Sequence, residues 1–273
     1  MFWLWISYQA VKGTFTLTVI WIPLFLLWRG NGGPQQVLSD WGPFLLANAG
    51  FVLSHIILFH PRLRRRLEGM AGKGIYNAAV GIVSALTFGM ALYTAIESPQ
   101  TVLWSATHLL AVISVMISLA GLALVTFGVG ARNPFSILGR QRDYLPEHPG
   151  IAAVTRHPVL WGIVLWSLGH LLINGTAGLV AFFLLQLIYA GIGLVMIEKR
   201  KKHSLGPEKW TELARNTSFF PNPGGLLLLL SSKNPVRKGV MIRLTLWLIL
   251  SAGLIAMHPV IFGVSPLSAA GLG

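Results

Sequence analysis

Seven apolar segments, each near the length needed to cross a lipid bilayer, run through this chain of 273 residues. Only 11% of the residues are charged, whereas a soluble domain has about 25%. The sequence therefore predicts an all-α fold, a polytopic transmembrane helix bundle of about seven spans, with six as the alternative. The expected spans are residues 3–28, 42–60, 74–96, 102–130, 158–173, 177–197 and 240–262.

The basic residues predict how the bundle is oriented. All but two of the 21 Lys and Arg residues lie between segments two and three, between four and five, or after segment six. The opposite loops hold only Arg29, Asp40 and Glu97 as formal charges. The positive-inside rule assigns the basic side to the cytoplasm, so we expect a cytoplasmic N-terminus. Basic residues placed this way meet anionic lipid, and the net charge of +13 therefore does not indicate a nucleic-acid partner.

The first segment is expected to be a retained anchor, because it lacks a basic n-region and an obvious cleavage site. We therefore expect residues 1–39 to form an extra N-terminal transmembrane anchor and residues 40–267 the main transmembrane domain. The largest polar piece, about 198–239, contains one helix-like run, GPEKWTELAR. The run GGLLLLL at 224–230 is too short to span, so we expect it at the membrane interface or against the bundle.

Three histidines lie inside apolar segments: His55, His108 and His170. Ionisable residues within a membrane are costly and are functional candidates by default. A neutral histidine can also bridge two helices through hydrogen bonds, which is the structural alternative. His55 shares a helix face with Asn48, and His170 shares one with Trp166, Ser167 and Asn174.

Two histidines on separate helices, in a chain without cysteine, are compatible with a b-type haem site, because neutral imidazole is a standard ligand of haem iron. The lack of cysteine excludes c-type haem attachment and iron–sulfur ligation. Zinc is less favoured, since no Asp or Glu lies within a span near these histidines. His55 lies about 8 Å and His170 about 18 Å from the cytoplasmic end of their helices. His108 is closer to His170 in depth, so the residue types leave the partner of His170 open between His55 and His108.

Several blocks together resemble the NnrU family, whose relatives include the plant 15-cis-zeta-carotene isomerase. They are FVLSH with the arginine-rich stretch after it, RNPFSILG, VTRHPVLWGIVLWSLGHLLING, LGPEKWTELARNTSFFP and MHPVIFGVSP, spread over about residues 40–267. In the isomerase, haem b is held by a histidine of the early helix and one of the helix after the RHP motif. The resemblance thus implies His55 and His170 as the iron ligands. Arg156 and His157, at the cytoplasmic mouth, are the further expected cofactor-binding residues, and His258 also stands at a family position.

The same resemblance implies redox-linked chemistry at the haem. In one alternative, an apolar polyene would undergo cis–trans isomerisation at the haem. In the other, the haem would bind a small gaseous ligand in nitrite and nitric oxide metabolism, because bacterial members of the family are associated with denitrification. We therefore expect an integral protein of the bacterial inner membrane, embedded in the lipid bilayer, that acts as an isomerase or in denitrification.

A more distant resemblance is to membrane methyltransferases of the isoprenylcysteine and phospholipid type. Those enzymes bind S-adenosylmethionine through an RHP-x-Y-x-G motif and a later pair of glutamates. Here Leu160 replaces the tyrosine, and Glu198 is followed by Lys199 where the second glutamate would stand. Arg156, His157 and Glu198 would then surround the cofactor. A non-enzymatic assembly factor or transporter is the third alternative, and interfacial packing of the arginine is the structural explanation of the motif.

Overall fold

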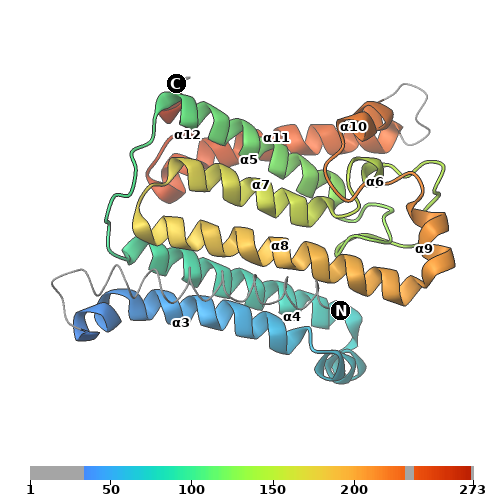
Figure 1. The fold of residues 1–273 in the computed structure, drawn as a ribbon, viewed down its shortest axis with the longest axis horizontal. Helices are drawn as coiled ribbons and strands as arrows, with labels where there is room; N and C mark the ends of the chain where they lie inside the picture. The colour runs from blue at the N-terminus through green and yellow to red at the C-terminus, as the bar shows by residue number, and fades with distance from the viewer. Residues whose placement is uncertain (1–33, 231–236, 272–273) are drawn as a thin grey trace, which may run out of the picture. The chain divides into compact units, whose positions relative to one another are not determined.

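A computed structural model of the chain describes residues 34–230 and 237–271 (Figure 1). The expected first span, residues 3–28, lies outside them. The described residues form helices and two isolated bridges, with no strand among them, so the all-α prediction is confirmed. The chain divides into two compact units. Among the described residues, unit one comprises the chain up to Trp104 together with Gly175–Leu185, and unit two comprises Ser105–Asn174 and the chain from Gln186 onward.

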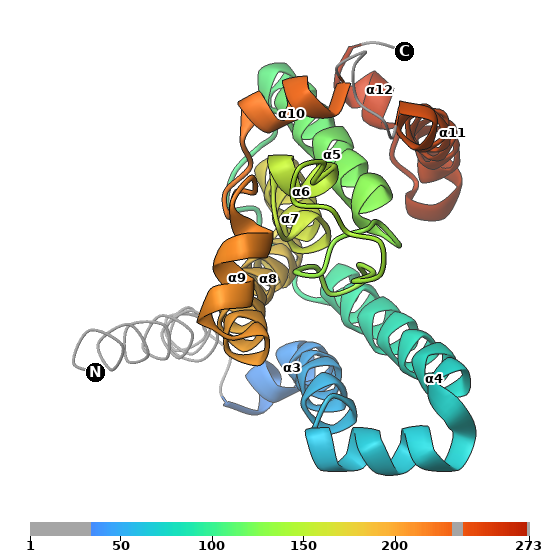
Figure 2. The same ribbon diagram turned by 90° about the vertical axis from the view of Figure 1, so that its right-hand side faces the viewer.

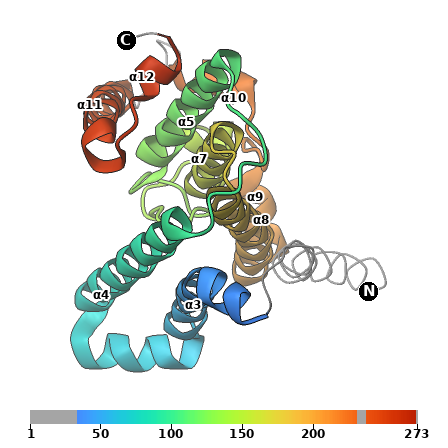
Figure 3. The ribbon, with the colours of Figure 1, turned by 90° about the vertical axis from the view of Figure 1, so that its left-hand side faces the viewer.

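Unit one is built on α3 (Pro34–Leu58) and α4 (Pro61–Glu97), which pack side by side (Figures 1 and 3). The arginine-rich stretch was expected to be a loop, but it forms the first part of α4. Pro61 suits the first helical turn, and Arg64 pairs with Glu68 one turn later at 2.9 Å. The helix then bends at Gly72, whose φ of 80° is readily adopted only by glycine (Figure 2).

The first turns of α8 (Ala177–Leu205) complete unit one. Phe182 meets Phe88 of α4 with ring centroids 5.4 Å apart. The backbone nitrogen of Leu103 donates to the carbonyl of Gly175 at 2.8 Å, within an extended connection. Residues 102–107, expected to be helical, are therefore not part of the next span.

Unit two has α5 (His108–Gly128) and α7 (Pro158–Ile173) packed closely together (Figure 1). Glycines make this approach possible, because a Cβ on Gly121 would lie 2.7 Å from the carbonyl oxygen of Gly162. The hydroxyl of Ser114 donates across the same contact to the carbonyl of Gly169 at 2.7 Å. Small residues with interhelical hydrogen bonds are the usual means of packing helices in a membrane.

The rest of α8, from Gln186, also belongs to unit two, and the remaining helices of this unit are short except for α11. The run GPEKWTELAR contains α9, as predicted, and GGLLLLL falls in α10. In α10 the side chain of Leu229 is buried with Val154, Phe127 and Val240, so this short helix packs against its own unit (Figure 2). Their bounds are α6 (Ile151–Val154), α9 (Pro207–Ala214), α10 (Pro223–Leu230), α11 (Arg237–Phe262) and α12 (Pro266–Ala269).

Five helices of the described part are long and apolar enough to cross a membrane. Helix α7 is apolar but has only 16 residues. The protein therefore has several helices capable of spanning a membrane, while the count of seven and the cytoplasmic N-terminus stay predictions. The five are Leu38–Leu58, Pro61–Glu97, His108–Gly128, Ala177–Leu205 and Gly239–Phe262.

Arg243, which the sequence groups with the basic residues after segment six, lies within α11 and closes the end of α5. Its Nη1 donates to the carbonyls of Thr126, Phe127 and Val129 at 2.6, 3.0 and 3.0 Å. The last carbonyls of a helix lack intrahelical partners and carry partial negative charge. Arg243 therefore joins two helices through a capping contact between distant parts of the sequence.

Replacing Arg243 by methionine is expected to lower the free energy of unfolding by about 2 kcal/mol, because the three carbonyls lose a charged donor. Denaturant unfolding of the detergent-solubilised protein measures this change. Arg66→Met is the matched control, since Arg66 is exposed in α4, and it should change the value by less than about 0.5 kcal/mol. Equal losses in both variants would contradict a capping role.

Candidate functional site

Three ionisable side chains of unit two meet at the start of α7. The Nη2 and Nε atoms of Arg156 lie 2.6 and 3.3 Å from the two carboxylate oxygens of Glu198. The Nε2 atom of His157 lies 2.6 Å from Oε2 of the same carboxylate. The sequence separates Glu198 from the other two by about forty residues, and α8 brings it back beside the RHP motif. This triad gathers the three residues that the methyltransferase resemblance had grouped.

The triad is largely shielded from water. The side chains of Arg156 and Glu198 are 14% and 20% exposed, and that of His157 is fully buried. Because the carboxylate can only accept, Nε2 of His157 carries the hydrogen of their bond. Its Nδ1 atom is buried with no hydrogen-bond partner among the described residues. Removing one member of the triad would leave a poorly solvated charge without its counter-charge, so the three side chains depend on one another for stability.

Backbone contacts hold residues 215–222, here called the clasped segment, against the triad. The backbone nitrogen of Arg156 donates to the carbonyl of Ser218 at 2.6 Å. The carbonyl of Phe219 accepts from the hydroxyl of Thr155 and from the indole nitrogen of Trp161, both at 2.9 Å. Arg156 also donates from Nη1 to the hydroxyl of Thr217 at 3.1 Å. The motif therefore secures a loop as well as pairing charges.

Tyr144, in the loop before α6, completes the same end of the unit. Its hydroxyl donates to the carbonyl of Leu213 at 3.1 Å. Burial raises the pKa of Tyr144 to about 12, and this effect outweighs the nearby charge of Arg156, which lowers the pKa. Tyr144 therefore stays protonated and keeps its hydrogen bond at any physiological pH.

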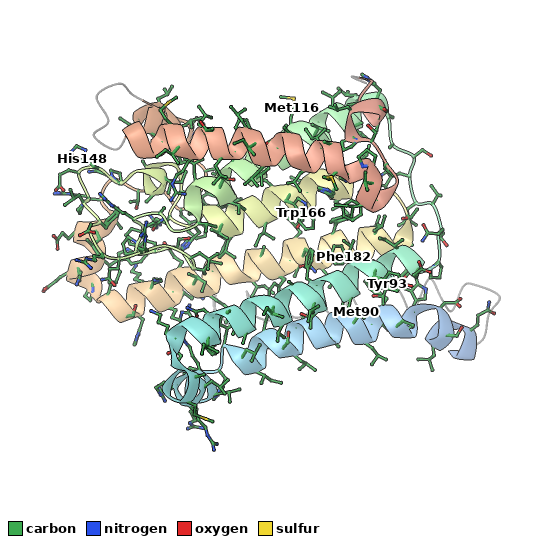
Figure 4. All side chains as sticks on the ribbon, turned by 180° about the vertical axis from the view of Figure 1, so that it is seen from behind. Met90, Tyr93, Met116, His148, Trp166 and Phe182 are labelled. Atoms are coloured by element: carbon green, nitrogen blue, oxygen red, sulfur yellow. The ribbon has the colours of Figure 1, made fainter. Side chains whose placement is uncertain are left out.

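A cavity of about 720 Å³ opens next to the clasped segment. Thr217 connects the cavity with the triad, because its side chain lines the cavity and its hydroxyl accepts a hydrogen bond from Arg156. An ion pair between Glu147 and Arg215 stands at the cavity wall. His148, which also lines it, lies at the end of the unit where α9 and α10 are found (Figure 4).

His55 lies in the last turn of α3, in unit one. Its Nδ1 atom lies 2.7 Å from the carbonyl oxygen of Phe51, and its Nε2 atom lies 3.3 Å from the hydroxyl of Ser84. A carbonyl only accepts, so Nδ1 carries the hydrogen and Nε2 keeps its lone pair in the neutral ring. The predicted neighbour Asn48 likewise bonds within α3, to the carbonyl of Phe44 at 2.8 Å.

His170 lies in the last turn of α7, in unit two, with the same local arrangement. Its Nδ1 atom lies 2.9 Å from the carbonyl oxygen of Trp166, whose ring centroid is 4.9 Å from that of the imidazole. Asn174 donates to the carbonyl of His170 at 2.8 Å. The hydroxyl of Ser167 is buried without a partner among the described residues. Figure 4 shows Trp166 well away from His148 along this unit.

Two further histidines of unit two deserve comparison with His170. The Nδ1 atom of His258 lies 2.7 Å from the carbonyl oxygen of Val264, and its ring is near enough to His170 for an electrostatic interaction. His108, the first residue of α5, faces Gly271, where an added Cβ would meet its ring. The sequence marked His258 only as standing at a family position and did not pair it with His170.

No group of three or more His, Cys, Asp or Glu side chains that could hold a metal occurs within residues 34–230 and 237–271. His55 and His170 belong to different units, so their pairing stays a prediction.

Comparison with known proteins gives one family. The family model described as NnrU protein matches residues 43–266. The chain belongs to the NnrU family. Searches of the curated proteins and of the solved structures found no match. This NnrU protein is thus a family member with several apolar helices, and the resemblances to the isomerase and to the methyltransferases remain inferences from sequence.

Proposed function

We propose that this NnrU protein is a haem b protein of the bacterial inner membrane, in which His170 and His55 would hold the iron. The observation that carries the proposal is the state of the two rings. Each gives its Nδ1 hydrogen to a carbonyl four residues earlier, which leaves Nε2 as the lone-pair nitrogen. Histidines that ligate metals typically show this arrangement, because the outer hydrogen bond fixes the tautomer and the ring orientation.

The surroundings of His170 also fit a flat apolar macrocycle. An indole ring lies beside the imidazole, and α7 is apolar over most of its length. The buried hydroxyl of Ser167 stands one turn earlier on the same face without a partner among the described residues. Arg156 and His157, the other expected cofactor-binding residues, are instead engaged by Glu198.

Haem held by two histidines supplies a redox-active iron whose coordination can open when one ligand leaves. In this chain the two imidazoles would hold the iron, and the apolar spans would exclude water. An apolar polyene undergoing cis–trans isomerisation or a small gas such as nitric oxide would suit such a surrounding. The latter would place the protein in denitrification.

The test is the absorption spectrum of the full chain purified in detergent from haem-replete cells, oxidised and reduced, with its haem content. We expect a Soret band and about one haem b per chain. Protein that lacks a Soret band under these conditions would refute the proposal. His55→Ala, His108→Ala and His258→Ala, compared in parallel, identify the second ligand, and we expect His55→Ala to change the spectrum.

A second candidate function is S-adenosylmethionine-dependent methyl transfer in the membrane. One observation favours it, namely that Arg156, His157 and Glu198 converge on one point. In that role the guanidinium would bind the carboxylate of the cofactor, and Glu198 would bind its ammonium group. Both oxygens of Glu198 are already engaged, so a cofactor would have to replace one of the cations. Isothermal titration with S-adenosylmethionine would give no heat if this candidate is wrong.

A further inference from the structure

The cavity beside the clasped segment combines a polar wall with an apolar one. Its polar wall includes Glu147, His148, Arg215, Asn216 and Thr217. Its apolar wall is made by Ala153 and by two leucines of α10, Leu228 and Leu229. A volume of about 720 Å³ is in the range of sites for small molecules. Such a cavity suits an amphiphile whose head is polar and whose remainder is apolar.

The polar wall presents one negative and one positive charge side by side. Arg215 donates from Nη2 to Oε1 of Glu147. The side chains of Arg215 and Glu147 are 52% and 57% exposed. An ion pair so open to water contributes little stability, and its members exchange partners at low cost. The pair is therefore complementary to a ligand that carries a negative and a positive group a few bonds apart.

The surrounding polar groups are held in place by the protein. The side-chain amide of Asn216 donates to the carbonyl of Pro146 at 2.9 Å. The hydroxyl of Thr217 donates to the carbonyl of Ala214 at 2.8 Å and accepts from Arg156. These hydrogen bonds fix Asn216 and Thr217 in the polar wall, whereas Glu147 and Arg215 can exchange each other for a ligand. The two charged side chains would therefore determine which ligand binds.

The apolar wall continues onto a surface suited to lipid chains. Leu226, Leu227 and Leu228 of α10 are exposed, although the helix is apolar along most of its length. In a protein with several membrane-spanning helices, exposed leucines next to a polar cavity are expected at the level where lipid heads and chains meet. A bound amphiphile would place its head in the cavity and its chains along α10.

We propose that this cavity binds the head of a zwitterionic phospholipid of the phosphatidylethanolamine class. The carboxylate of Glu147 would accept hydrogen bonds from the lipid ammonium, and the guanidinium of Arg215 would bind the phosphate in the two-pronged manner typical of arginine. A quaternary ammonium offers no N–H donor and prefers an aromatic cage. No Phe, Tyr or Trp is among the described residues that line the cavity, which favours ethanolamine over choline. An anionic head without the ammonium would be repelled by Glu147.

The test is native mass spectrometry of the full chain in detergent, titrated separately with dioleoyl phosphatidylethanolamine and dioleoyl phosphatidylglycerol. We expect the ethanolamine lipid to bind about tenfold more tightly, which corresponds to about 1.4 kcal/mol. Glu147→Gln should remove this preference, and Arg215→Gln should weaken the binding of both lipids. Glu208→Gln, at an exposed glutamate of α9, is the matched control and should leave the preference intact.

Soluble phosphoethanolamine, added as a competitor at the same concentration, separates a lipid site from a site for the free head. We expect it to leave the bound lipid in place, because the chains contribute to binding along α10. Equal affinity for the two lipids in the unaltered protein would overturn the proposal. So would a preference that survives Glu147→Gln, or full displacement by phosphoethanolamine. None of these outcomes depends on whether haem is bound.

Discussion

Replacing His170 by alanine is expected to lower the haem content of the purified protein at least about tenfold. Alanine provides no nitrogen for the iron, and even the loss of an outer partner of a metal ligand reduces affinity by about 10- to 100-fold. The pyridine haemochrome assay on detergent-solubilised protein measures the effect. Any haem that remains should show a spectrum altered from that of two-histidine ligation.

The control for this substitution is His203→Ala. His203 is exposed near the end of α8, beyond its apolar part, so the variant should keep the haem content of the unaltered protein. Gly162 and Gly121 lie where α7 closely approaches α5, and neither is changed by the substitution at position 170. A His170→Ala protein with an unchanged haem spectrum would remove His170 from the site.

Glu198→Gln is expected to lower the free energy of unfolding by about 3 kcal/mol. The amide keeps the size of the side chain but leaves the guanidinium of Arg156 without a counter-charge in a poorly solvated place, and removing one partner of a buried ion pair costs about this much. Denaturant unfolding in detergent measures the change. Hydrogen exchange should also quicken at Ser218 and Asn222, whose backbone nitrogens hold the clasped segment.

Glu212→Gln is the matched control for Glu198, because Glu212 is exposed on α9 and should change the stability by less than about 0.5 kcal/mol. The haem content of Glu198→Gln, normalised to folded protein, should equal that of the unaltered chain. A stability like that of the control would show that the triad does not hold the segment. A selective loss of haem would link the triad to the cofactor instead.

The apolar segments could be recognised from sequence because burial in lipid imposes a long run of apolar residues. Segment 158–173 matches α7, and 240–262 lies within α11. The ends were less predictable. Residues 102–107 are apolar enough for a span, but they form an extended connection that ends where the hydroxyl of Thr107 accepts from the backbone nitrogen of Leu110. Amino-acid composition alone does not distinguish a membrane span from an extended apolar connection.

The sequence could not reveal those features of the candidate sites that depend on contacts between residues far apart in the chain. Glu198 was singled out only through a motif, and its contact with Arg156 and His157 depends on the path of α8. Arg243 looked like one more basic loop residue, because its role rests on the end of a helix more than a hundred positions away. The cavity has no sequence pattern, since loops and α10 form it together. His170 could be found because an ionisable residue is rare in such an apolar run.

The electron paramagnetic resonance spectrum of the oxidised, detergent-solubilised protein tests the central claim most directly, because it reports the ligands of the iron. We predict a low-spin ferric signal of the kind that two imidazoles produce. This signal should be lost in His170→Ala and should become high-spin in His55→Ala. A protein without haem, or a low-spin signal that persists unchanged in both variants, would contradict ligation by His55 and His170.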